Sequence, residues 1–189
     1  MNEMISLYVF FGLIASGKST LAESFSKHYD MPYYNTDRVR KELAGVDPVS
    51  RQSDNFNQGI YTKEFSRKTY QAMLDKAGEK VRSGRKDVVL DGSYSSIDER
   101  TRVIEQAAAL NARCVFIQCV CSDKVVRDRL EIRARDPQAV SDGRWEIYLA
   151  QKESFQPPSE LEPSQLLTLA TEQSIAMLLE NLATSLDLQ

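Results

Sequence analysis

One loop motif constrains this chain more than any other feature. Residues 12–19 have the sequence Gly-Leu-Ile-Ala-Ser-Gly-Lys-Ser, which fits the pattern G-x-x-x-x-G-K-[ST] in full. The motif follows an apolar, strand-like run at residues 7–11 and precedes a segment typical of a helix at residues 18–27. In this setting the two glycines let the backbone curl around phosphate oxygens, and the helix directs its positive end at the same anion. The sequence therefore predicts a phosphate-binding loop between the first strand and the first helix.

The motif gives its residues different tasks. Lys18 is expected to reach the β- and γ-phosphates of a nucleotide, and the hydroxyl of Ser19 is a ligand for Mg²⁺. We therefore expect ATP and Mg²⁺ as cofactors. The remaining loop residues expected to surround the nucleotide are Gly12, Ala15, Ser16, Gly17 and Thr20.

Length and composition narrow the class of protein. A chain of 189 residues is most simply one domain, spanning residues 1–189, and is long enough to bury a proper core. The net charge of −3 argues against a protein that binds nucleic acid over its whole surface, although a local basic groove stays possible. The apolar run at residues 7–11 is too short to cross a membrane or to signal export, so we expect a cytoplasmic protein that does not contact membranes.

Cysteine and histidine suggest no further chemistry. Cys114, Cys119 and Cys121 lie in or beside one strand-like run, and their spacing is not that of a zinc site. We expect them to be core thiols. His28 closes the first predicted helix and is assigned no role.

Strand-like and helix-like segments alternate along the chain. The predicted strands are residues 6–11, 32–35, 87–91, 113–120 and 165–169, and the predicted helices are residues 18–27, 38–44, 62–83, 96–110, 122–135, 141–155 and 171–186. This alternation predicts an α/β fold, a three-layer sandwich with a five-stranded parallel sheet and right-handed crossovers. Ligands bind at the carboxyl ends of strands in such sheets. Residues 46–59 show little periodicity and are predicted to form a loop.

Asp91 ends the apolar strand at residues 87–91. A carboxylate at this position beside a phosphate loop can hold Mg²⁺ directly or through water. The alternative is an acid that only caps the loop after the strand. The loop at residues 12–19 favours the metal site.

Asp37 and Arg40 form the pattern D-x-x-R after the second predicted strand. There Asp37 could accept a proton from an attacking hydroxyl while Arg40 orients the acceptor. Asp37 could also be an ordinary helix N-cap. The two interpretations are compatible, and the sequence leaves both open.

The predicted helix at residues 122–135 is rich in arginine. Arg129 and Arg133 are separated by four positions and therefore lie on the same face. Phosphoryl transfer needs cations that close over the charge of the transition state, which predicts a lid at about residues 127–157. A solvated face with interleaved acids accounts for Arg127 and Arg135, so Arg129 and Arg133 are the site candidates.

Together these motifs resemble the small P-loop kinases of the AAA_33 "predicted kinase" type. The resemblance rests on residues 12–22, 37–45 and 88–94 and on the Arg129/Arg133 helix, and it covers about residues 7–158. Within that group the layout is similar to the kinase domain of phage-type polynucleotide kinase, to zeta toxins and to gluconate kinase.

The resemblance implies roles for individual residues. Asp37 would be the general base, Arg40 an acceptor-side arginine, Arg133 the lid arginine that bridges phosphates, and Arg129 a residue near the nucleotide. Residues 141–157 resemble the lid-to-helix segment of this group, including the Gln-x-x-x-(Phe/Leu)-x-Pro stretch of gluconate kinases.

The expected function is transfer of the γ-phosphoryl group of ATP to a hydroxyl of a small molecule, with residues 46–59 and the helix after them shaping the acceptor pocket. A 5′-hydroxyl polynucleotide kinase is the nearest alternative. It is less favoured because the chain has neither a phosphatase domain nor an evident basic track with aromatic stacking positions. An alternative of another class is a non-enzymatic ATP-binding switch or regulatory protein, in which nucleotide orders a lid against a partner. The sequence names neither the acceptor nor the oligomeric state.

Overall fold

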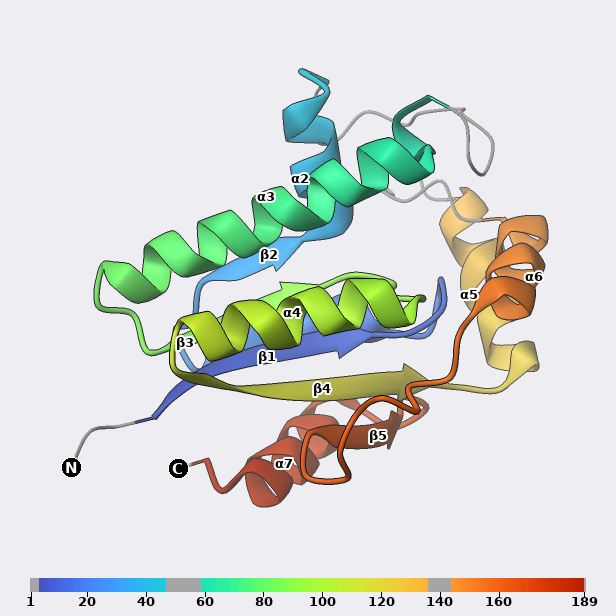
Figure 1. The fold of residues 1–189 in the computed structure, drawn as a ribbon. Coiled ribbons are helices and arrows are strands. Elements are labelled where there is room, and N and C mark those ends of the chain that lie inside the picture. Colours follow the sequence, from blue (N-terminus) through green and yellow to red (C-terminus); the bar gives the residue numbers. More distant parts are fainter. Residues whose placement is uncertain (1–3, 47–58, 136–143, 189) are drawn as a thin grey trace.

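The computed structural model describes residues 4–46, 59–135 and 144–188 (Figure 1). The loop predicted at residues 46–59 lies outside the described residues except at its two ends. The part of the predicted lid at residues 136–143 also lies outside them.

A parallel sheet forms the centre of the fold. Its strands are β1 (Ile5–Phe11), β2 (Tyr33–Asn35), β3 (Asp87–Asp91), β4 (Ala112–Val120) and β5 (Leu166–Ala170). The strand order is β2-β3-β1-β4-β5, and every neighbouring pair is parallel. The predicted α/β fold with a five-stranded parallel sheet is therefore confirmed.

Helices cover both faces of the sheet. They are α1 (Lys18–His28), α2 (Thr36–Leu43), α3 (Lys63–Arg82), α4 (Ile97–Ala109), α5 (Asp123–Arg135), α6 (Trp145–Ser154) and α7 (Ile175–Leu186), and a 3-10 turn, η1 (Gly59–Tyr61), precedes α3. Figure 1 shows α3 and α4 on one face, α7 on the opposite face, and α5 and α6 beyond the carboxyl ends of the strands.

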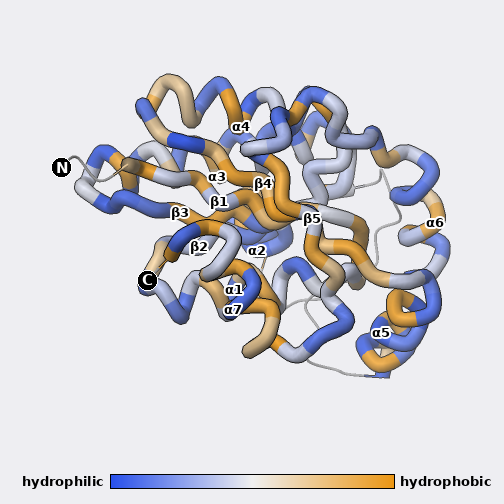
Figure 2. Tube along the Cα trace, turned by 90° about the horizontal axis from the view of Figure 1, so that it is seen from below, coloured by the Kyte–Doolittle hydropathy of each residue, from blue (hydrophilic) through white to orange (hydrophobic). Residues whose placement is uncertain are grey.

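The alternation of side chains along β1 explains the two layers. Leu7 and Val9 pack in one core with side chains of α3 and α4, whereas Tyr8 and Phe10 pack in the other with side chains of α1 and α7. Successive side chains of a strand point to opposite faces, so a strand that is apolar throughout must be covered on both sides. Figure 2 shows the apolar strands between more polar helices.

The predicted starts of the second and of the last helix are wrong. The last helix begins at Ile175, not at residue 171. The second helix begins at Thr36, not at residue 38, because the Oδ1 atom of Asn35 accepts hydrogen bonds from the backbone nitrogens of Asp37 (3.0 Å) and Arg38 (3.1 Å). Asn35 is thus the N-cap. The alternative that Asp37 is the N-cap is therefore excluded, and Asp37 lies in the first turn of the helix.

Other local predictions are confirmed. Ser96 and Glu99 form the predicted capping box at the start of α4, with the Ser96 hydroxyl accepting from the Glu99 nitrogen and the Glu99 carboxylate from the Ser96 nitrogen. Cys114 and Cys119 are buried core thiols as predicted, whereas Cys121 is partly exposed. Within the described ranges, no helix has both the length and the apolar character that a membrane span requires.

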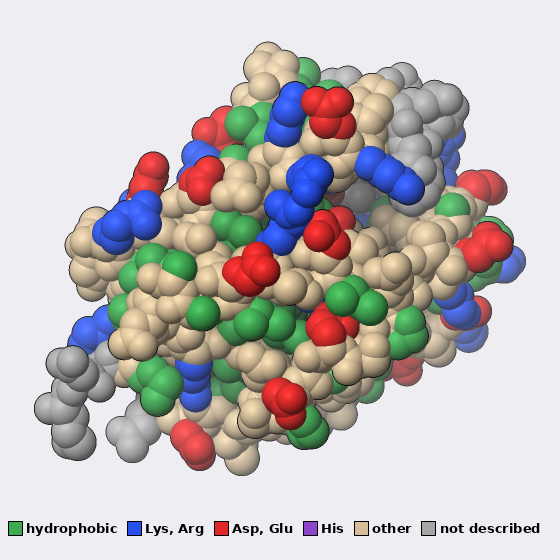
Figure 3. All heavy atoms as spheres, viewed as in Figure 1, with side chains coloured by type: hydrophobic (Ala, Val, Ile, Leu, Met, Phe, Trp, Pro, Cys, Tyr) green, Lys and Arg blue, Asp and Glu red, His purple; other side chains and the backbone are tan. Residues whose placement is uncertain are grey.

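The face of the molecule in Figure 3 carries Lys and Arg side chains interspersed with Asp and Glu side chains. No continuous basic track crosses this face.

Candidate active site

The two glycines of the phosphate loop are required by its geometry. Gly12 has a φ of +138°, and a Cβ atom there would lie 2.5 Å from the carbonyl oxygen of Cys119 on β4. Gly17 has a φ of +88° in the left-handed region, directly before α1. A larger residue at either position would be strained, and at Gly12 it would also collide with the backbone. The loop therefore folds tightly over the end of the central strands.

The loop curls so that Lys18 lies against its own backbone. The Nζ atom of Lys18 donates to the carbonyl oxygen of Leu13 at 3.2 Å, and the backbone nitrogen of Ser16 donates to the same oxygen at 3.2 Å. Ala15 adopts a φ of +59°, which is uncommon for a residue other than glycine. This is the inward curl that the motif predicts.

Arg129 and Thr171 fasten the outer side of the loop. Arg129 donates to the carbonyl oxygen of Ala15 at 3.1 Å and to that of Thr171 at 2.6 Å. The Thr171 hydroxyl, itself buried, donates to the carbonyl oxygen of Ser16. Thr171 was not among the predicted site residues, although its place directly after the fifth strand, at a carboxyl end, was a usable signal.

Asp91 lies at the end of β3 and is fully buried. Its Oδ2 atom accepts hydrogen bonds from the Tyr33 hydroxyl (2.7 Å) and from Nδ2 of Asn35 (2.6 Å), while Oδ1 has no hydrogen-bond partner among the described residues. Burial raises the pKa of the Asp91 carboxyl, and the charge of Lys18 together with the neighbouring polar groups, Ser19 included, acts in the opposite direction.

The residues at this point fit Mg²⁺. An unpartnered carboxylate oxygen on Asp91 and the hydroxyl of Ser19 are the hard oxygen ligands that this ion prefers. No group of three or more His, Cys, Asp or Glu that could hold a metal occurs in the described part of the chain. Mg²⁺ in a phosphate loop does not need one, because phosphate oxygens and waters supply most of its ligands.

Asp37 and Arg40 form an ion pair on α2. Arg40 Nη1 donates to Asp37 Oδ1 at 3.1 Å and Nη2 to the Ser66 hydroxyl at 3.4 Å, and the guanidinium lies 4.9 Å from the ring centroid of Tyr61. The Arg40 side chain is 9% exposed and that of Asp37 34%. Arg40 is thus fixed from three sides, while the Asp37 carboxylate stays accessible.

A cavity of about 1020 Å³ brings most of the predicted site residues together at the carboxyl ends of the strands. Its lining includes the predicted residues Ala15, Gly17, Lys18, Ser19, Asp37, Arg40 and Arg133. Gly12, Ser16 and Asp91 do not line it.

A smaller cavity of about 420 Å³ lies on the other side of the loop. Gly17 and Arg133 line both cavities, whereas Thr20 and Arg129 line only the smaller one. Arg129 and Arg133, predicted to lie on the same face of α5, therefore have different surroundings. Arg129 bonds to the backbone of the loop, whereas Arg133 lies between the two cavities.

Arg133 is partly buried between charges of both signs. Burial and the charge of Arg129 lower its pKa, and the carboxylates of Asp37 and Asp91 raise it. Arg127, predicted to lie on a solvated, ion-paired face, is exposed but stacks over the ring of Trp145 at 4.4 Å from its centroid.

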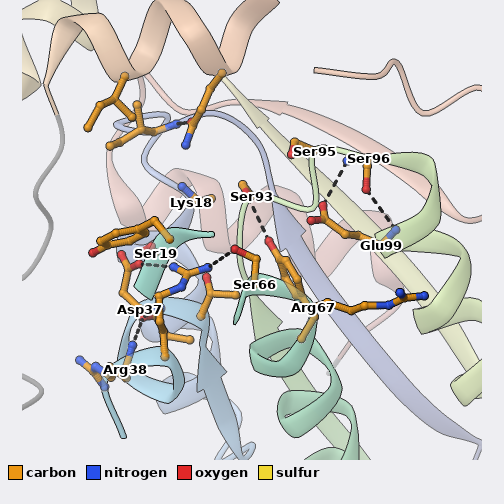
Figure 4. Close-up of a pocket in the computed structure, with 18 of the residues that line it drawn as sticks. Lys18, Ser19, Asp37, Arg38, Ser66, Arg67, Ser93, Ser95, Ser96 and Glu99 are labelled. Carbon is orange, nitrogen blue, oxygen red and sulfur yellow. Dashed lines mark hydrogen bonds and ion pairs between the residues drawn. The ribbon is translucent and has the colours of Figure 1, made fainter. Parts of the chain in front are cut away.

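Four serine residues that were not among the predicted site residues also line the larger cavity. They are Ser66, Ser93, Ser95 and Ser96 (Figure 4). The Ser93 hydroxyl lies 3.0 Å from that of the buried Tyr70. Ser93 and Ser95 follow β3, so their position at a carboxyl end was the available signal.

Helix α6 lines the larger cavity through Ile147, Gln151 and Ser154. The Oε1 atom of Gln151 accepts a hydrogen bond from the backbone nitrogen of Ile14 in the phosphate loop at 2.9 Å. Just beyond the helix, the Gln156 nitrogen donates to the Ser95 carbonyl (2.8 Å) and its Oε1 accepts from the Ile97 nitrogen (2.7 Å). The segment thus joins the phosphate loop to the residues that follow β3. The family resemblance singled out the Gln-x-x-x-(Phe/Leu)-x-Pro stretch that begins at Gln151, but not these contacts.

Arg100, which is fully buried in α4, holds the residues that follow the carboxyl end of α6. It donates to the carbonyl oxygens of Tyr94 (2.7 Å), Gln156 (3.0 Å) and Pro157 (3.2 Å) and pairs with Glu160. A guanidinium is suited to such a place, because its planar fork can serve several acceptors at once.

Several solved structures with similar architecture are kinases. A gluconokinase from Sinorhizobium meliloti aligns over 96% of this chain and 91% of its own, with 17% identity and a TM-score of 0.63. A sugar kinase from Janibacter sp. aligns over 98% and 96%, with 15% identity and a TM-score of 0.68. The Mycobacterium tuberculosis APS kinase, solved with AMPPNP and APS, aligns over 97% and 98%, with 15% identity and a TM-score of 0.65. At these identities the likeness establishes the fold.

The sequence relatives are much longer than this chain. Uncharacterized proteins of Mycobacterium tuberculosis and Mycobacterium bovis are 29% identical over 119 residues, which is 63% of this chain and 24% of theirs. The chain thus spans about a quarter of the length of these curated relatives. The family AAA_33, described as an AAA domain, matches residues 7–158, which include the phosphate loop, Asp37, Asp91 and the arginines of α5. The chain belongs to the AAA_33 family and has the fold of P-loop kinases.

Proposed function

We propose that this protein is an ATP-dependent phosphotransferase that moves the γ-phosphoryl group to a hydroxyl of a small molecule. One observation carries the proposal. Lys18, at the end of the phosphate loop, and the accessible carboxylate of Asp37, on α2, line the same cavity. A cation for the phosphates and a base for the acceptor are the two parts that such a transfer needs.

The nucleotide would lie across the loop. Backbone N–H groups of the loop and Lys18 would bind the phosphates, and the smaller cavity would receive the nucleoside. Ile175 and the guanidinium of Arg129 border that cavity, and together they offer the apolar and cationic surface that suits a flat aromatic base. Ser19 and Asp91 would hold Mg²⁺, which neutralises charge on the phosphates.

The acceptor would enter from the side of α2 and α3. Asp37 accepts the proton of the attacking hydroxyl, whose oxygen forms the new bond to the γ-phosphorus as the bond to the bridging oxygen breaks and ADP leaves. Arg40 keeps the Asp37 carboxylate in place through their 3.1 Å ion pair. Lys18 and Arg133 balance the negative charge that spreads over the transferring group.

The test is transfer from γ-labelled ATP to a panel of sugars and sugar acids, nucleosides, adenylylsulfate, aminoglycosides and 5′-hydroxyl oligonucleotides. We expect transfer to one acceptor class, lost in both Lys18→Ala and Asp37→Asn, with ATP affinity retained in Asp37→Asn. Transfer to oligonucleotides, with binding that weakens steeply as salt rises, would instead indicate a nucleic-acid kinase. ATP binding that Asp37→Asn leaves intact, without transfer to any acceptor, would favour a nucleotide switch.

A further inference from the structure

One peptide unit of the phosphate loop is hydrogen-bonded on both of its sides. The carbonyl oxygen of Leu13 accepts from Lys18 Nζ at 3.2 Å, and the N–H of the next residue, Ile14, donates to Gln151 Oε1 at 2.9 Å. Lys18, Ile14 and Gln151 all line the larger cavity. The same backbone unit therefore positions the loop lysine and one side chain of α6.

The chemistry of this contact fixes the orientation of the Gln151 amide. A backbone N–H can only donate, so the atom that faces it must be the amide oxygen and not the nitrogen. The Nε2 atom, with two N–H donors, is then directed away from Ile14. Among the described residues, no group accepts a hydrogen bond from it.

The helix that carries Gln151 is also held at its carboxyl end. The ring of Phe155 stacks on that of Phe11, with 6.4 Å between the ring centroids, and Gln156 is bonded through both its backbone and its side chain to Ser95 and Ile97. A side chain whose amide is bonded to the phosphate loop, and whose helix is fastened at its carboxyl end, loses little freedom when it meets a ligand.

We propose that Gln151 is a catalytic residue whose Nε2 donates a hydrogen bond to an oxygen of the transferring phosphoryl group. The inference rests on the proposed function and adds to it a neutral donor on α6. Charge in phosphoryl transfer is spread over three equatorial oxygens, and the protein acts mainly by positioning and electrostatic stabilisation. A donor fixed in advance needs no reorganisation when that charge develops.

Two substitutions separate this role from a purely structural one. Gln151→Glu keeps an oxygen that can accept from the Ile14 N–H, but it replaces the Nε2 donors with a negatively charged acceptor. Gln151→Met removes both functions at similar length. A structural role predicts that Gln151→Glu, which keeps the contact with Ile14, is less impaired than Gln151→Met. A catalytic donor predicts that Gln151→Glu is at least as impaired as Gln151→Met.

The readout is the binding of ADP with Mg²⁺, measured by calorimetry with and without aluminium fluoride, which imitates the phosphoryl group in flight. This probe needs no knowledge of the acceptor. In the wild type we expect aluminium fluoride to tighten ADP binding, and in both variants we expect that tightening to fall by about 10²–10³-fold, the usual effect of losing one preorganised donor. In Gln151→Met, which adds no charge, the affinity for ADP alone should change less than about threefold, because Gln151 would contact only the transferring group.

Glu153→Gln is the matched control, because Glu153 is exposed on the same helix and does not line the cavity. It should bind like the wild type, and the three variants should share the wild-type melting temperature to within a few degrees. Wild-type tightening in Gln151→Glu, or no tightening in the wild-type protein, would overturn the role of Gln151. Failure to bind ADP at all would instead overturn the proposed function.

Discussion

The two sides of the larger cavity are built from different kinds of contact. On the donor side, meaning the phosphate loop with Arg129, Thr171 and Gln151, most hydrogen bonds of the polar side chains are made with main-chain atoms. Exceptions are the bonds of Arg129 to the Thr171 hydroxyl and to the Cys121 thiol. On the acceptor side, meaning α2, the start of α3 and residues 93–102, many polar side chains bond to other side chains. Examples of the second kind are the contacts Arg40–Asp37, Arg40–Ser66, Tyr70–Ser93 and Arg102–Asp98.

This difference has a consequence for evolution and for engineering. A side chain that bonds to the main chain depends on the path of the backbone, which changes little when neighbouring residues are replaced. A pair of side chains can be replaced together without moving the backbone. We therefore expect the donor side to be tied to nucleotide chemistry and the acceptor side to determine which hydroxyl is phosphorylated.

The largest effect is expected at Arg133, which lines both cavities. Arg133→Met should lower the rate of phosphoryl transfer by about 10³–10⁵-fold if this arginine acts like an arginine finger. Single-turnover kinetics at saturating ATP would measure it, once an acceptor is known. Arg135→Met, on the exposed end of the same helix, is the control and should leave the rate unchanged. A loss of rate below tenfold in Arg133→Met would show that phosphoryl transfer does not depend on the charge of Arg133.

The next effect is expected on the donor side, at Arg129. Arg129→Ala removes hydrogen bonds to the buried Ala15 and Thr171 carbonyls, and it should lower the free energy of unfolding by about 3 kcal/mol. Arg129→Lys should recover only part of this, because an ammonium cannot reproduce the fork geometry. Urea denaturation of the two variants would measure both values. Full recovery in Arg129→Lys would contradict the claim that donor-side geometry depends on main-chain bonding.

A smaller effect is expected at Tyr70 on the acceptor side. Its hydroxyl accepts from the buried Tyr94 nitrogen at 3.1 Å and lies 3.0 Å from the Ser93 hydroxyl. Tyr70→Phe leaves that nitrogen unpartnered and should lower the free energy of unfolding by about 1–2 kcal/mol. The affinity for ADP, measured by calorimetry, should stay the same. A weaker affinity would mean that the two sides are coupled more tightly than their contacts indicate.

The smallest effect is expected at the exposed pair of Arg38 and Glu23, whose charged atoms are 3.5 Å apart. Arg38→Ala should change the free energy of unfolding by at most about 0.2–1 kcal/mol, because exposed ion pairs are screened by water and salt. Thermal unfolding at low and at high salt would show it. A change in acceptor KM without a change in stability would place Arg38 among the residues that contact the acceptor.

The strands were predictable because each is an apolar run between turn residues, and their parallel arrangement followed from the helices between them. The phosphate loop was predictable because its tight turn needs positive φ angles, which glycine adopts readily, at Gly12 and Gly17. The start of α2 was not. Asn35 and Asp37 are both good N-caps, and the choice between them depends on Asn35 lying at the end of β2, where it also donates to Asp91 on β3.

The sequence by itself determined the parallel sheet, the phosphate loop and the position of Lys18 and Asp37 at one edge, because local periodicity and the carboxyl-end rule suffice for these. Arg133 was predicted from the arginine-rich helix and from the family resemblance. Only the tertiary structure decided that Thr171 fastens the loop, that Arg100 fixes the end of the α6 segment and that Gln151 meets Ile14. These contacts join residues that are 137 positions apart for Gln151 and Ile14 and 155 for Thr171 and Ser16. No local pattern encodes such a pairing, since it depends on how whole helices pack against the sheet.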